Sequence, residues 1–263
     1  MKKQVYMPGA EEQFSDHPGE REVERMPEAE RSCDEISERL AGVLCRIEAA
    51  AMRSDRAPEE ITLVAVTKKH TAHVIRCAIE AGAHDLGENR VQEADAKITE
   101  LGRREARWHL IGHLQANKAR RAVALFDVIH SVDSISLARR LDRLCAEAGR
   151  DELPVLLQVD LAGEATKSGI AEAELSPLIE AVRGCERLRL LGLMALPPFH
   201  DEAEMVRPYF RRLRELRDLH HERGAFGDGR GELSMGMSHD FEVAIEEGAS
   251  MVRVGTSIFG ERR

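Results

Sequence analysis

Short apolar runs of strand length alternate along most of this chain with longer amphipathic segments. Residues 36–47 have apolar side chains at helical spacing, so an amphipathic helix is expected first. Further helix signals lie between the apolar runs, such as Thr71 at an N-cap and Gly82 at a C-cap of TAHVIRCAIEAG. The runs that predict strands are ITLVAVT, HDLGE, WHLIG, DVIHSV, PVLLQVD, LLGLMAL, ELSMGM and MVRVGT.

Alternating strands and helices require parallel crossover connections, and eight repeats in roughly 230 residues predict a closed (β/α)8 barrel, an α/β TIM barrel. The alternative is an open doubly wound sheet, which usually has a glycine-rich turn after its first strand. No G-x-G-x-x-G follows ITLVAVT, and GAFGDGRGE at 224–232 precedes the seventh predicted strand. We therefore interpret that stretch as a flexible connection.

Residues 1–30 differ from the rest of the chain, because they are rich in charge, Pro and Gly and poor in apolar anchors. They are predicted to form a mobile tail, and residues 31–263 the barrel domain. No segment approaches the roughly 18 uninterrupted apolar residues of a membrane span, and none resembles a signal peptide, so a cytoplasmic protein without a membrane partner is expected.

Charge and cysteine content exclude further classes. A formal net charge of -9 argues against a nucleic-acid partner, because phosphate backbones are bound by a surplus of Lys and Arg. The five cysteines are an odd number without a C-x-x-C pair, so we expect a reduced compartment rather than a disulfide framework or a zinc site.

Polar residues follow the predicted strands, at the ends that form the mouth of a barrel. Lys68 ends the first strand, and SMGMS and GTSIFG near the end of the chain offer hydroxyls and backbone N–H groups that can hold a phosphate. Together they suggest a phosphorylated carbonyl compound held as an imine, since a partly buried lysine is a nucleophile for aldehydes. Two alternatives remain open: that Lys68 reaches water from the barrel rim or pairs with Glu88 or Asp160, and that Ser238 is the N-cap of DFEVAIEEG.

The sequence blocks themselves resemble a known family. LVAVTK, DLGENRVQEADAKI, WHLIGHLQANKAR, IHSVDS, LLQVDLAGEATKSG, GLMALPP and LSMGMSHDFEVAIEEGASMVRVGTSIFG resemble, in order, the pyridoxal phosphate homeostasis proteins, the YggS/PROSC family. The resemblance covers residues 32–263. It implies a fold-type III barrel that binds pyridoxal 5′-phosphate (PLP), similar to the N-terminal domain of alanine racemase but without its C-terminal β domain.

The resemblance also implies roles for single residues. Lys68, and not Lys69, resembles the lysine that holds PLP as a Schiff base, and Arg253 resembles the arginine that faces the pyridine nitrogen. Phosphate contacts are implied for Ser238, Gly255 and Thr256. The remaining residues implied near the cofactor are Asn89, His113, Asn117 and Met194. The chain departs from the family pattern at Asp160, where Asn is frequent, and at Thr71, where Pro is common.

The implied function is a PLP carrier that maintains PLP (vitamin B6) homeostasis, affects amino-acid pools and passes PLP to apo-enzymes. The alternative is a PLP-dependent amino-acid racemase, which needs a second base that neither Tyr6 nor Tyr209 convincingly supplies, although a histidine such as His113 or His239 could substitute. A sugar-phosphate aldolase that uses Lys68 is a third possibility, because it requires the same lysine and the same phosphate-binding segments. A metal enzyme is poorly supported by the spacing of His109 and His113. Because no C-terminal β domain is expected, we also expect a monomer.

Overall fold

The computed structural model describes residues 32–163 and 168–260, so the predicted tail at 1–30 lies outside the described residues. In the described part of the chain, eight parallel strands form a ring that closes through pairings of β1 with β9 and of β4 with β5. The ring consists of β1 (Thr62–Val66), β2 (Asp85–Glu88), β3 (Arg107–Leu110), β4 (Val128–Val132), β5 (Leu153–Asp160), β7 (Leu188–Ala195), β8 (Glu232–Met237) and β9 (Met251–Val254). The predicted (β/α)8 barrel is confirmed. A short further strand, β6 (Ile170–Ala171), pairs with β5 outside the ring.

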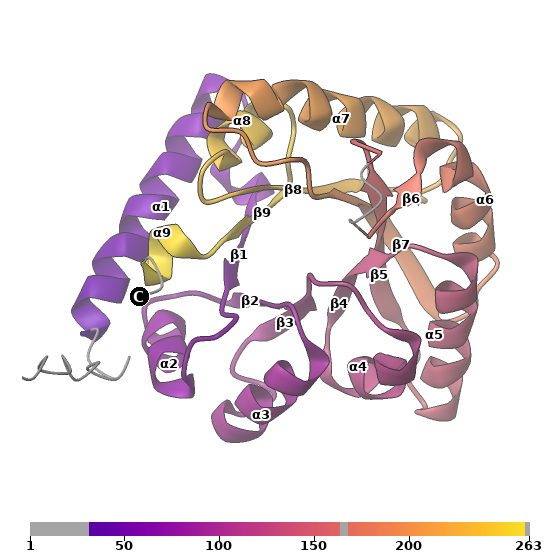
Figure 1. Ribbon diagram of the computed structural model, residues 1–263, viewed down its shortest axis with the longest axis horizontal. Helices are drawn as coiled ribbons and strands as arrows, with labels where there is room; N and C mark the ends of the chain where they lie inside the picture. The colour runs from indigo at the N-terminus through magenta and orange to yellow at the C-terminus, as the bar shows by residue number, and fades with distance from the viewer. Residues whose placement is uncertain (1–31, 164–167, 261–263) are drawn as a thin grey trace, which may run out of the picture.

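Helices surround the ring on its outer side (Figure 1). They are α1 (Cys33–Arg53), α2 (Ala72–Glu80), α3 (Val91–Leu101), α4 (Ala119–Leu125), α5 (Ile135–Glu147), α6 (Glu172–Arg183), α7 (Arg207–Glu222), α8 (Phe241–Glu246) and α9 (Thr256–Phe259), with 3-10 turns η2 (Pro58–Glu60), η3 (Ala116–Lys118) and η4 (Ala203–Val206). Thr71 caps α2 as predicted, because its hydroxyl accepts the Val74 N–H. Among the described residues, no helix combines the length and apolar character that crossing a membrane requires.

The hydrophobic core has two parts, because successive strand residues point alternately out to the helices and into the ring. The main cluster packs the outer faces of the strands against the helices. Two smaller clusters are separate from it, and strand alternation places them inside the ring. Their members are Val128, Leu156, Met194 and Met251 in one, and Val64, Val66 and Ile111 in the other.

The N-terminal helix α1 packs against α8, α9 and α2, and so joins the first and last units of the barrel (Figure 1). Four of its predicted apolar positions are buried, whereas Leu44 is 46% exposed. The structure also joins Cys33 of α1 to Cys77 of α2 in a disulfide. The expectation of no disulfide was wrong for this pair, because 44 positions separate the two cysteines and only the packing of α1 on α2 brings them together.

Candidate functional site

Most of the predicted site residues lie just beyond the carboxyl ends of barrel strands. Because all strands of the ring are parallel, these ends share one face, here called the rim. Residues that follow β1, β2, β3, β8 and β9 at the rim are Lys68, Asn89, His113, Asn117, Ser238, Gly255 and Thr256. Met194 and Arg253 belong to β7 and β9 themselves. The structure therefore brings together residues that the sequence spreads over almost 190 positions.

The backbone that precedes Lys68 is fixed by a buried network. Thr67 is fully buried, and its hydroxyl donates to Glu88 Oε1 at 2.5 Å. The Lys97 ammonium donates to the Thr67 carbonyl at 2.7 Å and to Glu88 Oε1 at 2.6 Å. Burial raises the pKa of Glu88, and the Lys97 charge opposes that rise. Strand β2 and helix α3, through Glu88 and Lys97, therefore hold the end of β1 in place.

The two lysines of the sequence motif have different surroundings. Lys68 is half-buried, whereas Lys69 is exposed, has a φ of 65° and donates its backbone N–H to Glu93. The two carboxylates considered as partners for Lys68 have other contacts. Glu88 binds Thr67 and Lys97, and Asp160 accepts the N–H groups of Ala162 and Gly163 at 3.0 and 3.1 Å. Asp160 therefore stabilises the turn after β5.

Backbone amides beyond β9 converge on the Ser238 hydroxyl beyond β8. Its oxygen accepts the Gly255 N–H at 3.1 Å and the Ser257 N–H at 3.3 Å. Gly255 lies close to β1, since a Cβ there would stand 3.3 Å from the Val66 carbonyl oxygen. Convergent N–H groups and a hydroxyl suit an anion. Ser257 was not predicted to belong to the site, although it follows Thr256 directly.

The alternative role for Ser238, as an N-cap, is wrong. Helix α8 begins at Phe241, and its N-cap residue is Asp240. The Asp240 carboxylate accepts the Met237 N–H at 2.6 Å and so closes the turn after β8. This leaves the Ser238 hydroxyl to contact the segment beyond β9.

A hydrogen-bonded column of polar side chains crosses the inside of the ring. His109 Nε2 lies 2.7 Å from Asp85 Oδ1, and His109 Nδ1 lies 2.8 Å from His130 Nε2. His130 Nδ1 lies 2.9 Å from Ser234 Oγ, which also accepts from Arg253 Nη1 at 2.6 Å. We call this set, from Asp85 to Arg253, the polar column. It connects β2, β3, β4, β8 and β9.

Burial sets the charge states in the polar column. It lowers the pKa of His109 and takes that of His130 well below its usual value, so both rings are neutral at pH 7. Burial also lowers the pKa of Arg253 to about 10, with Asp240 opposing, so Arg253 stays charged at pH 7. Its second nitrogen donates to the Ala195 carbonyl at 2.8 Å. Both ring nitrogens of His109 have hydrogen-bond partners, Asp85 and His130. The structure therefore gives no support to a metal site that His109 would share with His113.

The other predicted residues differ in exposure. Asn89 is half-buried, and its Oδ1 has no hydrogen-bond partner among the described residues. His113 is half-exposed, with Nδ1 3.2 Å from Asp133 Oδ2, and Asn117 is exposed in η3. Met194 is fully buried in the cluster inside the ring. Of these four residues, Asn89 is the one that presents a buried acceptor without a hydrogen-bond partner among the described residues.

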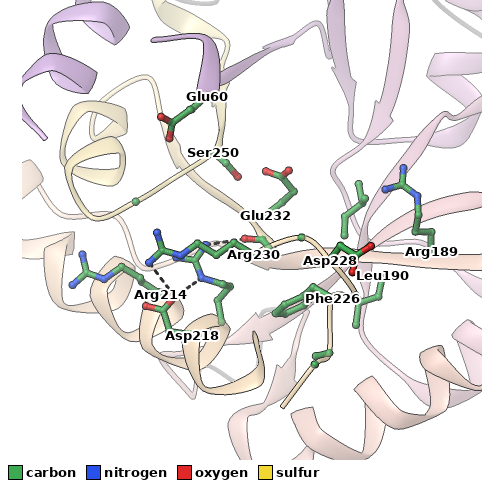
Figure 2. A pocket seen from close by; sticks show the side chains of 18 of the residues that line it. Glu60, Arg189, Leu190, Arg214, Asp218, Phe226, Asp228, Arg230, Glu232 and Ser250 are labelled. Carbon is green, nitrogen blue, oxygen red and sulfur yellow. Dashed lines mark hydrogen bonds and ion pairs between the residues drawn. The ribbon is translucent and has the colours of Figure 1, made fainter. Parts of the chain in front are cut away.

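A cavity of about 1180 Å³ lies at the opposite face of the barrel, and Figure 2 shows side chains that line it. It is lined by the start of β8, the residues before β9 and the loop at 224–231. Its arginines are paired: Arg217 and Arg230 both contact Asp218, and Arg217 donates to the Gly231 carbonyl. Function in such barrels belongs to the carboxyl ends of the strands, so this cavity is not the candidate site.

Comparisons with known proteins show the family of this chain. Residues 48–263 match the family model described as "Alanine racemase, N-terminal domain". The pyridoxal phosphate homeostasis protein of Aquifex aeolicus is 43% identical over 86% of this chain and 98% of its own length. That of Pseudomonas aeruginosa is 45% identical over 86% and 96%. PipY of Synechococcus elongatus, solved with PLP bound, is 41% identical with a TM-score of 0.74, covering 86% of this chain and all of its own. The chain therefore belongs to the alanine racemase N-terminal domain family and, within it, to the pyridoxal phosphate homeostasis proteins.

Proposed function

We propose that this protein binds PLP covalently through Lys68 and acts as a carrier that maintains the cellular PLP supply. The observation that carries the proposal is the placement of Lys68 on the same rim as the amides that converge on Ser238. PipY, a relative of 41% identity, was solved with PLP bound. We further propose that the carrier works as a cytoplasmic monomer, passes PLP to PLP-dependent apo-enzymes and thereby affects amino-acid pools.

The rim residues fit this cofactor by their chemistry. Ser238, Gly255 and Thr256 would hold the phosphate, whose oxygens accept hydrogen bonds from hydroxyls and amides. Asn89 offers the unpaired Oδ1 of its side chain. The remaining residues proposed to line the site are His113, Asn117 and Met194. When bound, PLP supplies an aldehyde that reacts with amines and a ring that accepts electrons.

Arg253, which is buried and charged, would face the ring nitrogen. A cation there discourages protonation of that nitrogen and so weakens the ring as an acceptor of electrons.

A carrier is favoured over a racemase by the lack of a suitable second base among the described residues. Tyr209 lies in α7 with its ring stacked on that of His200, at 6.3 Å between centroids, and Tyr6 lies outside the described residues. His113 contacts Asp133, and His239 Nε2 lies 2.9 Å from the Asp201 carbonyl oxygen. These contacts support a protein that binds PLP without catalysis.

The test is an absorption spectrum after PLP is added and the excess removed, followed by borohydride reduction and peptide mapping. We expect a near-visible band that shifts on reduction, with the label on Lys68. Lys68→Ala should abolish the band, and Lys69→Ala, the matched control on the neighbouring residue, should keep it. Equal loss in both variants would refute the assignment of Lys68.

Two further outcomes separate the alternatives. A protein that shows no band at all would favour a sugar-phosphate aldolase, because an imine with a sugar does not absorb in the near-visible. If the band forms, incubation with single amino-acid enantiomers followed by chiral separation should show no interconversion. Rapid interconversion that depends on Lys68 would replace the carrier by a racemase.

A further inference from the structure

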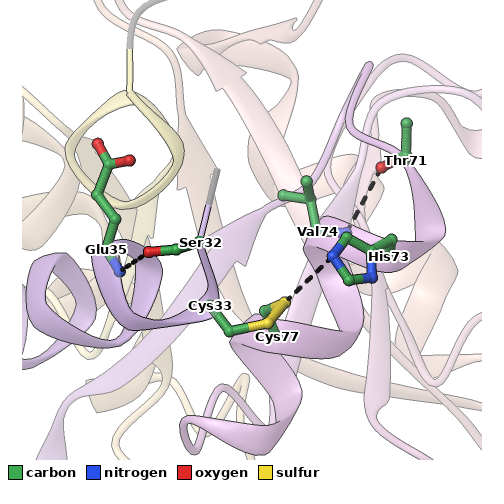
Figure 3. Close-up of a disulfide and its surroundings, with 7 residues drawn as sticks. All are labelled: Ser32, Cys33, Glu35, Thr71, His73, Val74 and Cys77. Atoms are coloured by element: carbon green, nitrogen blue, oxygen red, sulfur yellow. Dashed lines mark hydrogen bonds between the residues drawn. A yellow bond between two sulfur atoms is a disulfide. The ribbon is translucent and has the colours of Figure 1, made fainter. Parts of the chain in front are cut away.

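The disulfide between Cys33 and Cys77 lies on the outer surface of the barrel, where α1 meets α2 (Figure 3). Cys33 is the first residue of α1 and is exposed, whereas Cys77 is buried. Their Cα atoms are 5.0 Å apart, a separation that a disulfide bridges without backbone movement. An exposed sulfur beside a buried one gives an entering thiol or disulfide access to Cys33 alone.

Two features of the surroundings make these sulfurs reactive. The Cys33 sulfur stands at the N-terminus of α1, a helix of 21 residues whose free N–H groups favour the thiolate. The first turn also holds the carboxylates of Asp34 and Glu35, which oppose this effect, and that of Glu35 is paired with Arg39 at 2.5 Å. The exposed ring of His73 places its Nε2 4.0 Å from Cys77 Sγ, one helical turn away on α2. A histidine at this position can take the thiol proton.

We propose that Cys33, Cys77 and His73 form a reversible thiol–disulfide site that exchanges with small-molecule disulfides and thiols. In the oxidising direction, the Cys33 thiolate attacks one sulfur of a disulfide RSSR, forms a mixed disulfide and releases RS⁻. His73 then takes the proton of Cys77, whose thiolate attacks the Cys33 sulfur and displaces the second RS⁻. The released thiolates take up the protons, so two protein thiols and RSSR become one protein disulfide and two RSH.

The other cysteines of the chain do not share these features. Cys145 is buried and Cys185 half-buried, and burial raises the pKa of both thiols, that of Cys185 to about 11. Cys45 is exposed on the same helix as Cys33 but lies in the helix interior rather than at its start. Cys45 is therefore the matched control, because it is exposed, as Cys33 is, but lies away from the helix N-terminus and forms no disulfide.

The bond closes the segment 33–77, which contains β1 and Lys68. Oxidation therefore ties α1 to the helix that follows the proposed PLP lysine, and reduction releases that covalent link. The proposal about the cysteines does not depend on the proposed PLP function. The two can be tested separately, because thiol exchange is measured on protein without PLP.

The experiment equilibrates the full chain in buffers of varied glutathione to glutathione-disulfide ratio, followed by acid quenching, alkylation and peptide mass spectrometry. We expect a disulfide-linked peptide pair containing Cys33 and Cys77, whose fraction follows the ratio and reaches the same value from either direction. Cys33→Ser and Cys77→Ser should abolish the pair, and Cys45→Ser should leave its titration unchanged. His73→Asn should slow oxidation by roughly tenfold near neutral pH, and high pH should remove that difference.

Three results would overturn the proposal. The pair could stay reduced at every ratio, or it could stay oxidised until the protein is unfolded, which would make the bond purely structural. Alternatively, the reduced protein could retain added Zn²⁺ so tightly that oxidation is blocked, which would assign the three side chains to a metal site. A thermal melt of His73→Asn that matches the unaltered protein shows that a slower exchange does not come from unfolding.

Discussion

The Ser238 hydroxyl helps to connect the segments beyond β8 and β9, beside the Ser257 hydroxyl, which donates to the Ser238 carbonyl at 3.3 Å. The Ser238 hydroxyl accepts two backbone N–H groups, and in the proposed function it stands with them around the cofactor phosphate. Ser238→Ala removes this hydroxyl and leaves a charged acceptor one hydrogen bond short. We expect PLP retention to weaken by about 1–3 kcal/mol. Equilibrium dialysis of PLP against the two proteins measures this difference.

Ser136 at the start of α5 provides the control, because it is an exposed hydroxyl close to the rim that contacts only the Ser134 hydroxyl among the described residues. Ser136→Ala should retain PLP as the unaltered protein does. Equal retention by Ser238→Ala would place the phosphate elsewhere on the rim.

At the scale of elements, α3 is fixed to the barrel by a buried ion pair. Lys97 and Glu88 are both buried, and their contact lies directly behind the backbone that leads to Lys68. Lys97→Met leaves the Glu88 charge buried without its partner. We expect a loss of about 3–5 kcal/mol in the free energy of unfolding, measured by urea denaturation at pH 7.

The matched control also breaks an ion pair of α3. Asp95 of α3 contacts Arg121 of α4, and both side chains are much more exposed than Lys97 and Glu88. Arg121→Met should change stability by no more than about 1 kcal/mol, because water screens exposed pairs. A Lys97→Met variant as stable as Arg121→Met would mean that Glu88 takes up a proton or water at little cost.

The same elements show what the sequence could predict. The eight strands of the ring were predictable because each is a short apolar run between helical segments, and parallel closure then placed Lys68, Ser238 and Gly255 on one rim. The contacts of Lys97 with Glu88, of His130 with Ser234 and of Cys33 with Cys77 were not predictable. They join residues between 9 and 104 positions apart, and no periodicity encodes which side chains meet across a barrel.

At the scale of the whole molecule, the polar column connects strands from opposite parts of the ring. Its two histidines are fully buried, and their pKa values lie below the ordinary value in the folded protein. In the unfolded chain, the pKa of histidine is about 6.5. Below that pH the unfolded chain binds protons that the folded barrel does not bind, so acid favours unfolding.

We therefore expect the free energy of unfolding to fall as the pH decreases from about 7 toward 5, with each histidine contributing at most about 1.4 kcal/mol per pH unit. Burial raises the pKa of three carboxyl groups, those of Glu88, Asp133 and Asp240. These groups increase the free energy of unfolding as the pH falls, but at lower pH, closer to the range in which carboxyl groups titrate. Urea denaturation across this pH range gives the total slope. A histidine variant is needed to isolate the contribution of the two histidines to that slope.

His130→Asn removes one titrating group from the column while keeping a polar side chain there. We expect it to be less stable at pH 7, because the Ser234 and His109 contacts are disturbed, but to lose less stability between pH 7 and 5. The exposed His84 lies outside the polar column and is the control, so His84→Asn should keep the full slope. If His130→Asn kept the slope of the unaltered protein, the column would already be protonated when folded, and the acid sensitivity would have to come from groups outside the ring.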